Sequence, residues 1–319
     1  MRPISVLNVE GRIFFSAVHK RVANFLIKNG YISTKMQKAF IEGIAGCIEH
    51  GILIQEAIRY AREHRKSICI TWLDLANAFG CVPHMLVQFC LRWYNLPAFI
   101  SRLFFNYYEG VFSYIDGPNW SSEWYWIAID VPQGCTASTI IFNMTFQIIL
   151  DIHKVRAGHL KFDMPKAGIS IFRPAYADDV GLATDSPAHG QESLGHFRWA
   201  LDWSRAFRLR VVKCRSYAAM PFPTSRREFI KHQPSKSYSS FDPKLTMDGL
   251  LILFIGYDIK NDRMFKYVGH YIQDDNKTDR ISAMVDKKLQ DWQSKIDETL
   301  LTGPMKSWCL NFGVGRQIA

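Results

Sequence analysis

Two adjacent carboxylates, Asp178 and Asp179, stand between two apolar runs. Residues 168–172 before them and 180–184 after them have the composition of strands, and the Asp pair supplies turn residues, so the pattern predicts a β-hairpin with its charges at the tip. The alternative is an ordinary acidic turn, since an aromatic-x-Asp-Asp string also arises by chance. A further carboxylate upstream favours a chemical role.

That carboxylate is Asp74, which ends a mostly apolar run beginning at Ser67. Such a run is typical of a strand buried on both faces. A carboxylate at the end of a buried strand is costly unless a cation or a hydrogen-bond network meets it. Asp74 and Asp178 in one sheet would therefore make a metal site, and their hard oxygen ligands favour magnesium.

Three short motifs surround these carboxylates: Asp-Leu-x-x-Ala-Phe at 74–79, Gln133-Gly134 followed by Ser138, and Tyr-Ala-Asp-Asp at 176–179. In order and spacing they resemble motifs A, B and C of reverse transcriptases. Flanking segments resemble the non-long-terminal-repeat, LINE-type branch of retrotransposons, and they are Arg2-Pro-Ile-Ser, Gln37-Lys-Ala-Phe, Lys213-Cys and Phe265-Lys-Tyr-Val-Gly269. Each motif is weak alone, but the ordered combination is specific.

The resemblance implies an RNA-directed DNA polymerase that extends a primer 3′-hydroxyl with deoxynucleoside triphosphates on an RNA template. Two Mg²⁺ ions, with Mn²⁺ as an alternative, would be held by Asp74, Asp178 and Asp179, and Asp179 would be auxiliary because neighbouring strand residues point to opposite faces. Lys213 matches the motif D lysine that donates a proton to pyrophosphate. A plain surface lysine is the alternative.

The resemblance also implies contacts to the incoming nucleotide, from Arg2, Leu75, Phe79, Gln133 and Gly134. Arg2 would fork onto the triphosphate, or else be an arginine of a frayed terminus. Phe79 would block a 2′-hydroxyl, or else be a core residue. A primer grip would be formed by Lys266, Tyr267 and Gly269, for which a surface hairpin is the alternative.

Three positions depart from the family pattern: Asn77 where many relatives carry Lys, Gly80 where many carry Asp, and Thr139 where Pro is usual. None of these is a metal ligand. A second interpretation is a catalytically inactive or domesticated nucleic-acid-binding remnant of such an element. An RNA-dependent RNA polymerase is a third, which Phe79 disfavours.

Composition fits a polyanionic partner, since the chain of 319 residues has a net charge of +10 and a pI near 9.2, although the same balance also fits a membrane-surface protein or an ordinary soluble one. The stretch between Trp203 and Phe241 is rich in Lys and Arg and contains one acid, Glu228. This stretch either lines a nucleic-acid channel or forms a solvated basic face.

The seven cysteines form no Cys-x-x-Cys pair, which argues against a zinc ribbon or a disulfide framework. The N-terminus lacks a signal-peptide pattern, and apolar runs such as 249–257 are too short for a membrane helix. We therefore expect an intracellular protein, in the nucleus or cytoplasm, that is not secreted and has no transmembrane segment. The oligomeric state is left open.

Helical spacing predicts helices at 13–27, at 37–65 with breaks near Gly46 and Gly51, from Pro83 to about 105, and at 136–150, 191–207 and 279–300. Strands are predicted near residues 67–73 and at 209–212, and a hairpin at 110–126.

These elements and the resemblance predict an α+β protein with a right-hand polymerase fold. It would have an antiparallel-sheet palm, helical fingers and a partial thumb, and the chain would be a fragment of its element. The expected domains are fingers at 1–65 with their N-terminal part missing, palm at 66–84, an insertion between fingers and palm at 85–132, palm with motifs B to E at 133–273, and a partial thumb at 274–319.

Overall fold

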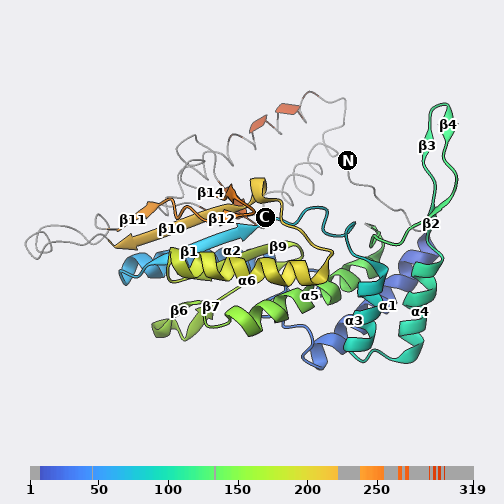
Figure 1. Cartoon of the computed structure of the whole chain (residues 1–319), viewed down its shortest axis with the longest axis horizontal. Coiled ribbons are helices and arrows are strands. Elements are labelled where there is room, and N and C mark those ends of the chain that lie inside the picture. The colour runs from blue at the N-terminus through green and yellow to red at the C-terminus, as the bar shows by residue number, and fades with distance from the viewer. Residues whose placement is uncertain are drawn as a thin grey trace, which may run out of the picture. The chain divides into compact units, whose positions relative to one another are not determined.

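The computed structural model describes residues 8–44, 46–132, 134–221, 238–254, 265–267 and 270–272, and isolated positions between 287 and 298 (Figure 1). The chain divides into two compact units, Met1–Ile272 and Gln273–Ala319. In the second unit, the described residues Asp291 and Lys295 are helical and form an ion pair of 2.8 Å.

A six-stranded sheet forms the centre of this unit, in the order β11-β10-β1-β9-β8 with β14 also paired to β10. All its pairings are antiparallel except that of β14. The strands are β1 (Ile68–Leu73), β8 (Ala175–Tyr176), β9 (Asp179–Thr184), β10 (Arg215–Pro221), β11 (Tyr238–Phe241) and β14 (Leu253–Phe254). Strand β1 is buried on both faces, as predicted.

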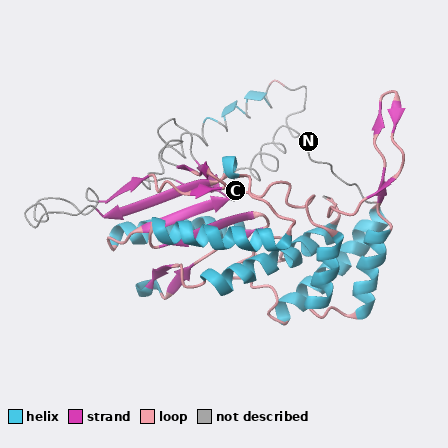
Figure 2. Ribbon diagram, in the orientation of Figure 1, coloured by secondary structure: helices cyan, strands magenta, loops and turns pink. Residues whose placement is uncertain are grey.

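Alternate residues of β1 point to opposite sides of the sheet. Cys69 and Leu73 join a core that includes α5 (Thr136–Ala157) and α6 (Pro187–Ser204). Ile68, Ile70 and Trp72 instead join a core with α2 (Gly46–Glu63). The sheet is thus covered by helices on both faces, and Figure 2 shows α6 running along it.

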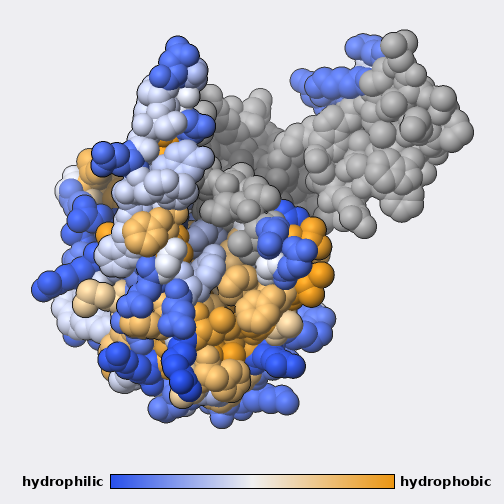
Figure 3. All heavy atoms as spheres, turned by 90° about the vertical axis from the view of Figure 1, so that its right-hand side faces the viewer, coloured by the Kyte–Doolittle hydropathy of each residue, from blue (hydrophilic) through white to orange (hydrophobic). Residues whose placement is uncertain are grey.

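The remaining helices are α1 (Val9–Lys28), α3 (His84–Trp93) and α4 (Ala98–Glu109). The Asn8 side chain caps α1 by accepting from the Gly11 N–H at 2.8 Å. The side of the molecule that carries α1, α3 and α4 also shows hydrophobic residues at its surface (Figure 3). Exposed apolar side chains on these helices include Ile13, Phe14, Met85, Trp93 and Phe99.

Short antiparallel ribbons complete the described part of the unit. They are β2 (Phe112–Ser113) with β5 (Tyr125–Trp126), β3 (Asp116–Gly117) with β4 (Trp120–Ser121), β6 (Phe162–Met164) with β7 (Ile169–Ile171), β12 (Thr246–Met247) with β13 (Leu250–Leu251), and β15 (Phe265–Tyr267) with β16 (His270–Ile272). The first two pairs form the hairpin predicted at 110–126.

The predicted helices at 13–27, 136–150 and 191–207 are confirmed with shifted ends. The prediction of one helix to about 105 was wrong, because Pro97 separates α3 from α4 and a proline disfavours helical backbone in the residue before it. The predicted break at Gly51 was also wrong, since Gly51 lies buried inside α2. Residues 37–44, predicted as the start of that helix, are irregular.

The predicted strand at 209–212 was wrong as well. Leu209 makes an isolated bridge with Leu75, and Val211–Lys213 forms a 3-10 turn, η2, before β10 begins at Arg215. The thumb helix predicted at 279–300 lies largely outside the described residues. In the described part of the chain, no helix combines the length and apolar character needed to cross a membrane.

Candidate active site

Asp74 lies directly after β1, where the backbone is held on both sides of it. The Arg210 N–H donates to the Asp74 carbonyl at 2.8 Å, and the Ala76 N–H donates to the Arg208 carbonyl at 2.8 Å. These bonds lie on either side of the antiparallel pair Leu75 and Leu209. In such a pair the two residues do not bond to each other, so the Leu75 carbonyl points away from Leu209. The exposed basic residues Arg208 and Arg210 therefore belong to the segment that holds Asp74.

One carboxylate oxygen of Asp74, Oδ2, is buried and has no hydrogen-bond partner. Burying a carboxylate oxygen without a partner is costly, so the position favours a cation. No group of three or more His, Cys, Asp or Glu residues able to hold a metal is present in the described part of the chain. A magnesium ion at this place would take further ligands from substrate phosphates and water, as this ion commonly does.

Asp178 lies in the turn of the β8–β9 hairpin and Asp179 begins β9. The predicted strand at 168–172 was partly wrong, because β7 pairs with β6 and the hairpin proper starts at Ala175. The turn is also one residue earlier than predicted, at 177–178. Since β9 pairs with β1 as far as Val180 opposite Leu73, the hairpin tip and Asp74 lie at the same end of the sheet.

The charges of Asp178 and Asp74 each contribute to the raised pKa of a cysteine thiol. Burial raises the pKa of Cys81 to about 11. A hydrogen bond to its own backbone opposes the rise, and the Asp178 charge adds to it. Burial likewise raises the pKa of Cys214 to about 11, with a hydrogen bond to the Asp74 backbone opposing and the Asp74 charge adding to the rise. Both cysteines therefore stay protonated at neutral pH.

The hairpin is held from the segment between α1 and α2. The buried His50 of α2 directs Nε2 to the carbonyl oxygens of Met36 and Ala175, at 3.0 and 3.1 Å. Burial lowers the pKa of His50, with the Lys38 charge adding to this, so the ring is neutral and Nε2 carries the proton that both carbonyls accept. Gln37 contacts the turn itself.

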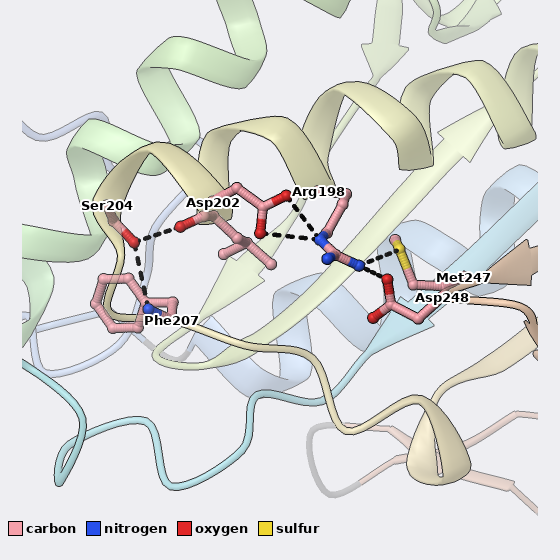
Figure 4. A network of polar contacts seen from close by, with 7 residues as sticks. Arg198, Asp202, Ser204, Phe207, Met247 and Asp248 are labelled. Atoms are coloured by element: carbon pink, nitrogen blue, oxygen red, sulfur yellow. Dashed lines mark hydrogen bonds and ion pairs between the residues drawn. The ribbon is translucent and has the colours of Figure 1, made fainter.

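The segment that reaches Asp74 from the other side is anchored by α6, as Figure 4 shows. Arg198 Nε donates to both carboxylate oxygens of Asp202, at 3.0 and 2.9 Å, and its guanidinium also pairs with Asp248 in the β12–β13 turn. Ser204 Oγ donates to the Leu201 carbonyl at 2.6 Å and accepts from the Phe207 N–H at 3.2 Å. The helix therefore ends in a fixed turn that leads into residues 208–210.

Phe79 is partly buried against the core. Its ring stacks on Phe142 of α5, with 4.4 Å between centroids and 14° between planes, and meets Phe40 edge-on at 6.2 Å. Phe40 in turn lies 6.4 Å from Tyr176, the residue two before Asp178. Phe142 and Phe40 thus hold the Phe79 ring in place. Both a packing role and a nucleotide-selecting role require such support.

The three residues that depart from the family pattern are Asn77, Gly80 and Thr139. Asn77 and Gly80 lie against each other, and Thr139 contacts His19. Asn77 has a left-handed φ of 50°, and a Cβ at Gly80 would overlap its side-chain amide. Thr139 Oγ1 donates to the Thr136 carbonyl at 2.8 Å and lies 3.1 Å from Nδ1 of His19, which joins α5 to α1. Neither contact involves a carboxylate of the site.

Of the other predicted site residues, the structure describes the surroundings of Gly134 and Lys213. Gly134 is exposed with a φ of 107°, a conformation that favours glycine. Lys213 is exposed at the end of η2, where its N–H donates to the Arg210 carbonyl at 2.8 Å. Lys266 and Tyr267 lie in β15, without description of their side chains. Arg2, Gln133 and Gly269 lie outside the described residues.

Comparison with known proteins adds a family assignment to this geometry. Residues 1–272 match the family described as reverse transcriptase (RNA-dependent DNA polymerase). A similar curated protein is the retrovirus-related Pol polyprotein from type-2 retrotransposable element R2DM of Drosophila melanogaster, which is 30% identical over 142 residues. That alignment covers 44% of this chain and 13% of the polyprotein, so the chain matches only a small part of that relative.

Proposed function

Because the chain belongs to the reverse transcriptase family, we propose that its Asp74–Asp178 site adds deoxynucleotides to a primer 3′-hydroxyl on an RNA template. The observation that supports this proposal is that Asp74 and the hairpin carrying Asp178 lie at the same end of the central sheet, with the buried Asp74 Oδ2 lacking a hydrogen-bond partner. The similarity to a Pol polyprotein of a non-long-terminal-repeat element supports a LINE-type origin.

Nucleotide addition is phosphoryl transfer, in which the protein chiefly positions the reactants and neutralises charge. Asp74, Asp178 and Asp179 would hold two Mg²⁺ ions. When bound, such ions lower the pKa of the attacking hydroxyl and offset the charge of the triphosphate. The Leu75 carbonyl lies outside the bridge to Leu209 and is thus available as a further oxygen ligand.

The chain's own residues would do the rest. Arg208 and Arg210 are exposed in the segment bonded to the backbone around Asp74, and Lys213 is exposed three residues further on; these cations would attract the phosphates of nucleotide and duplex. Lys213 would protonate the leaving pyrophosphate. Phe79, supported by Phe142, would exclude a 2′-hydroxyl from the sugar position.

In this proposal the six-stranded sheet belongs to the palm, residues 1–65 to the fingers, residues 85–132 to an insertion between fingers and palm, and residues 274–319 to a partial thumb. The partners are an RNA template, a DNA primer and deoxynucleoside triphosphates, and the place of action is intracellular, in the nucleus or cytoplasm. Lys266, Tyr267 and Gly269 would grip the primer end.

Extension of a labelled DNA primer on an RNA template with Mg²⁺ tests the proposal. The wild type should extend the primer, and Asp74→Asn should not. A wild-type protein that binds the duplex but extends nothing, with Mg²⁺ or Mn²⁺, would favour a nucleic-acid-binding remnant. Extension with ribonucleotides in preference to deoxynucleotides would instead favour an RNA polymerase.

A further inference from the structure

Gln37 is completely buried, yet its side-chain amide bonds on both sides. Its Oε1 accepts from the Ala177 N–H at 2.9 Å and from the Ala39 N–H at 3.1 Å. Its Nε2 donates to the Ala177 carbonyl at 3.2 Å. One side chain therefore satisfies both backbone groups of a residue 140 positions away in the chain.

Ala177 is an unusual residue to hold in this way. It has a φ of 52°, in the left-handed region that residues with a Cβ rarely adopt, and it is 5% exposed. Its N–H and carbonyl belong to the two peptide planes on either side of it, and the second plane leads directly to Asp178. Fixing both planes therefore fixes the direction in which the Asp178 side chain leaves the turn.

The neighbouring backbone supports the same register. The Ala175 N–H donates to the Met36 carbonyl at 2.9 Å, and the Lys38 N–H donates to the Ala175 carbonyl at 3.1 Å. These bonds form a parallel bridge between Gln37 and Ala175. The bridge holds Gln37 beside the hairpin, where its side-chain amide reaches the turn.

We infer that Gln37 is a positioning residue for the metal-binding turn: its buried amide holds Ala177 in the left-handed conformation that aims Asp178 at the site of Asp74. The inference rests on the proposed function, and it goes beyond it by assigning a role to a residue outside the three carboxylates. Removing a group that orients a metal ligand weakens metal binding even though the ligand itself remains.

The experiment compares Gln37→Met with Gln147→Met in the full chain. Gln147 is a matched control because it is also buried, and it donates only to Asp151 at 2.8 Å, away from the turn. Mn²⁺ is the probe, titrated by electron paramagnetic resonance, and the exchange of the Ala177 amide proton is followed by NMR in metal-free protein.

Gln37→Met should weaken Mn²⁺ binding by about 10- to 100-fold, the scale expected for loss of a supporting partner. Its Ala177 amide should exchange much faster, while amides of β9 change little. Gln147→Met should melt earlier but keep wild-type Mn²⁺ affinity. If Gln37→Met does not fold, Gln37→Asn replaces it, because an amide one methylene shorter cannot reach both groups of Ala177.

Unchanged Mn²⁺ affinity in the folded Gln37 variant would overturn the inference, and so would weaker binding with slow exchange at Ala177. Failure of the proposed function gives a different pattern, namely a wild type that extends no primer. The exchange comparison still tests Gln37 in that case, since it requires neither metal nor activity.

Discussion

The Arg210 N–H donates to the Asp74 carbonyl at 2.8 Å, so a basic segment is fixed to the backbone of a proposed metal ligand. Arg208 and Arg210 consequently stand near the site by construction of the fold. Salt dependence of nucleic-acid binding provides a test of what these cations do.

Replacing Arg208 and Arg210 with Gln should weaken binding of an RNA–DNA duplex and flatten its salt dependence. Each phosphate contact that is lost lowers the slope of log K against log salt by about 1. Arg59→Gln is the control, because Arg59 pairs with Glu56 and Glu63 on α2. Equal slopes in all proteins would mean that residues 208–210 are only a solvated face. The same titration on Arg226→Gln and Arg227→Gln tests the rest of the basic tract.

Asp74→Asn and Asp178→Asn should each lower primer extension by about 10³-fold or more, which corresponds to about 4 kcal/mol of transition-state stabilisation. Duplex binding should stay close to wild type, because phosphate contacts elsewhere carry the affinity. Single-turnover extension and filter binding measure the two quantities. Asp116→Asn, in the β3–β4 hairpin, is a control for loss of one surface charge. Extension at the wild-type rate by either motif variant would remove that carboxylate from the mechanism and contradict the proposed pair.

Phe79→Val should admit ribonucleotides if the ring lies beneath the sugar. We expect the ratio of kcat/KM for a deoxynucleotide to that for its ribonucleotide to fall by about tenfold or more, or ~1.4 kcal/mol. The stack on Phe142 also predicts a lower Tm, since truncating a core Phe to Ala costs about 3–5 kcal/mol.

The fully buried Phe104 separates these effects. Phe104→Val should melt early and keep the wild-type discrimination ratio. A Phe79→Val protein that behaves in the same way would show that Phe79 only packs, and the RNA-polymerase interpretation would regain support.

Acid should destabilise the protein partly through His153, which is fully buried in α5 with Nε2 3.1 Å from the Ser193 carbonyl. Burial, aided by the Arg173 charge, lowers the pKa of His153 to about 3. Because the unfolded state has the higher pKa and binds the extra proton, the free energy of unfolding falls as pH falls from about 6.5 towards 3, by up to about 1.4 kcal/mol per pH unit.

His153→Gln should remove this contribution, while His50, whose pKa is also lowered, continues to contribute. Urea denaturation at pH 4.5, 5.5 and 6.5 measures the difference in slope between variant and wild type. Identical slopes would mean that folding does not change the pKa of His153.

Sequence was sufficient for the elements with strong patterns. The apolar run before Asp74 and the periodic residues of α1, α5 and α6 identify their elements directly, because burial on both faces or on one face leaves a repeat in the chain. The family resemblance also implied that Asp74 and the Asp178 hairpin belong to one sheet, and β1 does pair with β9.

Other features depend on contacts between distant residues. The turn at Ala177 was placed one residue late because Asp is the better turn former, whereas the left-handed alanine is stabilised by Gln37, far away in sequence. Residues 209–212 have strand composition, but Leu209 makes only an isolated bridge with Leu75, and Val211–Lys213 forms the η2 turn. Gln37 stood inside a recognised flanking motif, and nothing in that motif indicated which backbone groups its amide would bind.

The position of β1 between β9 and β10 sets a limit on how the gene for such a chain can change. Both ladders fix the register, with Ile70 opposite Ala183 on one side and Tyr217 on the other. Substitutions on the strand alter packing locally, but deleting one codon between Ile68 and Asp74 would exchange the two faces of the strand and draw the carboxylate away from the hairpin tip. We therefore expect the length of this segment to be inherited more strictly than its residues.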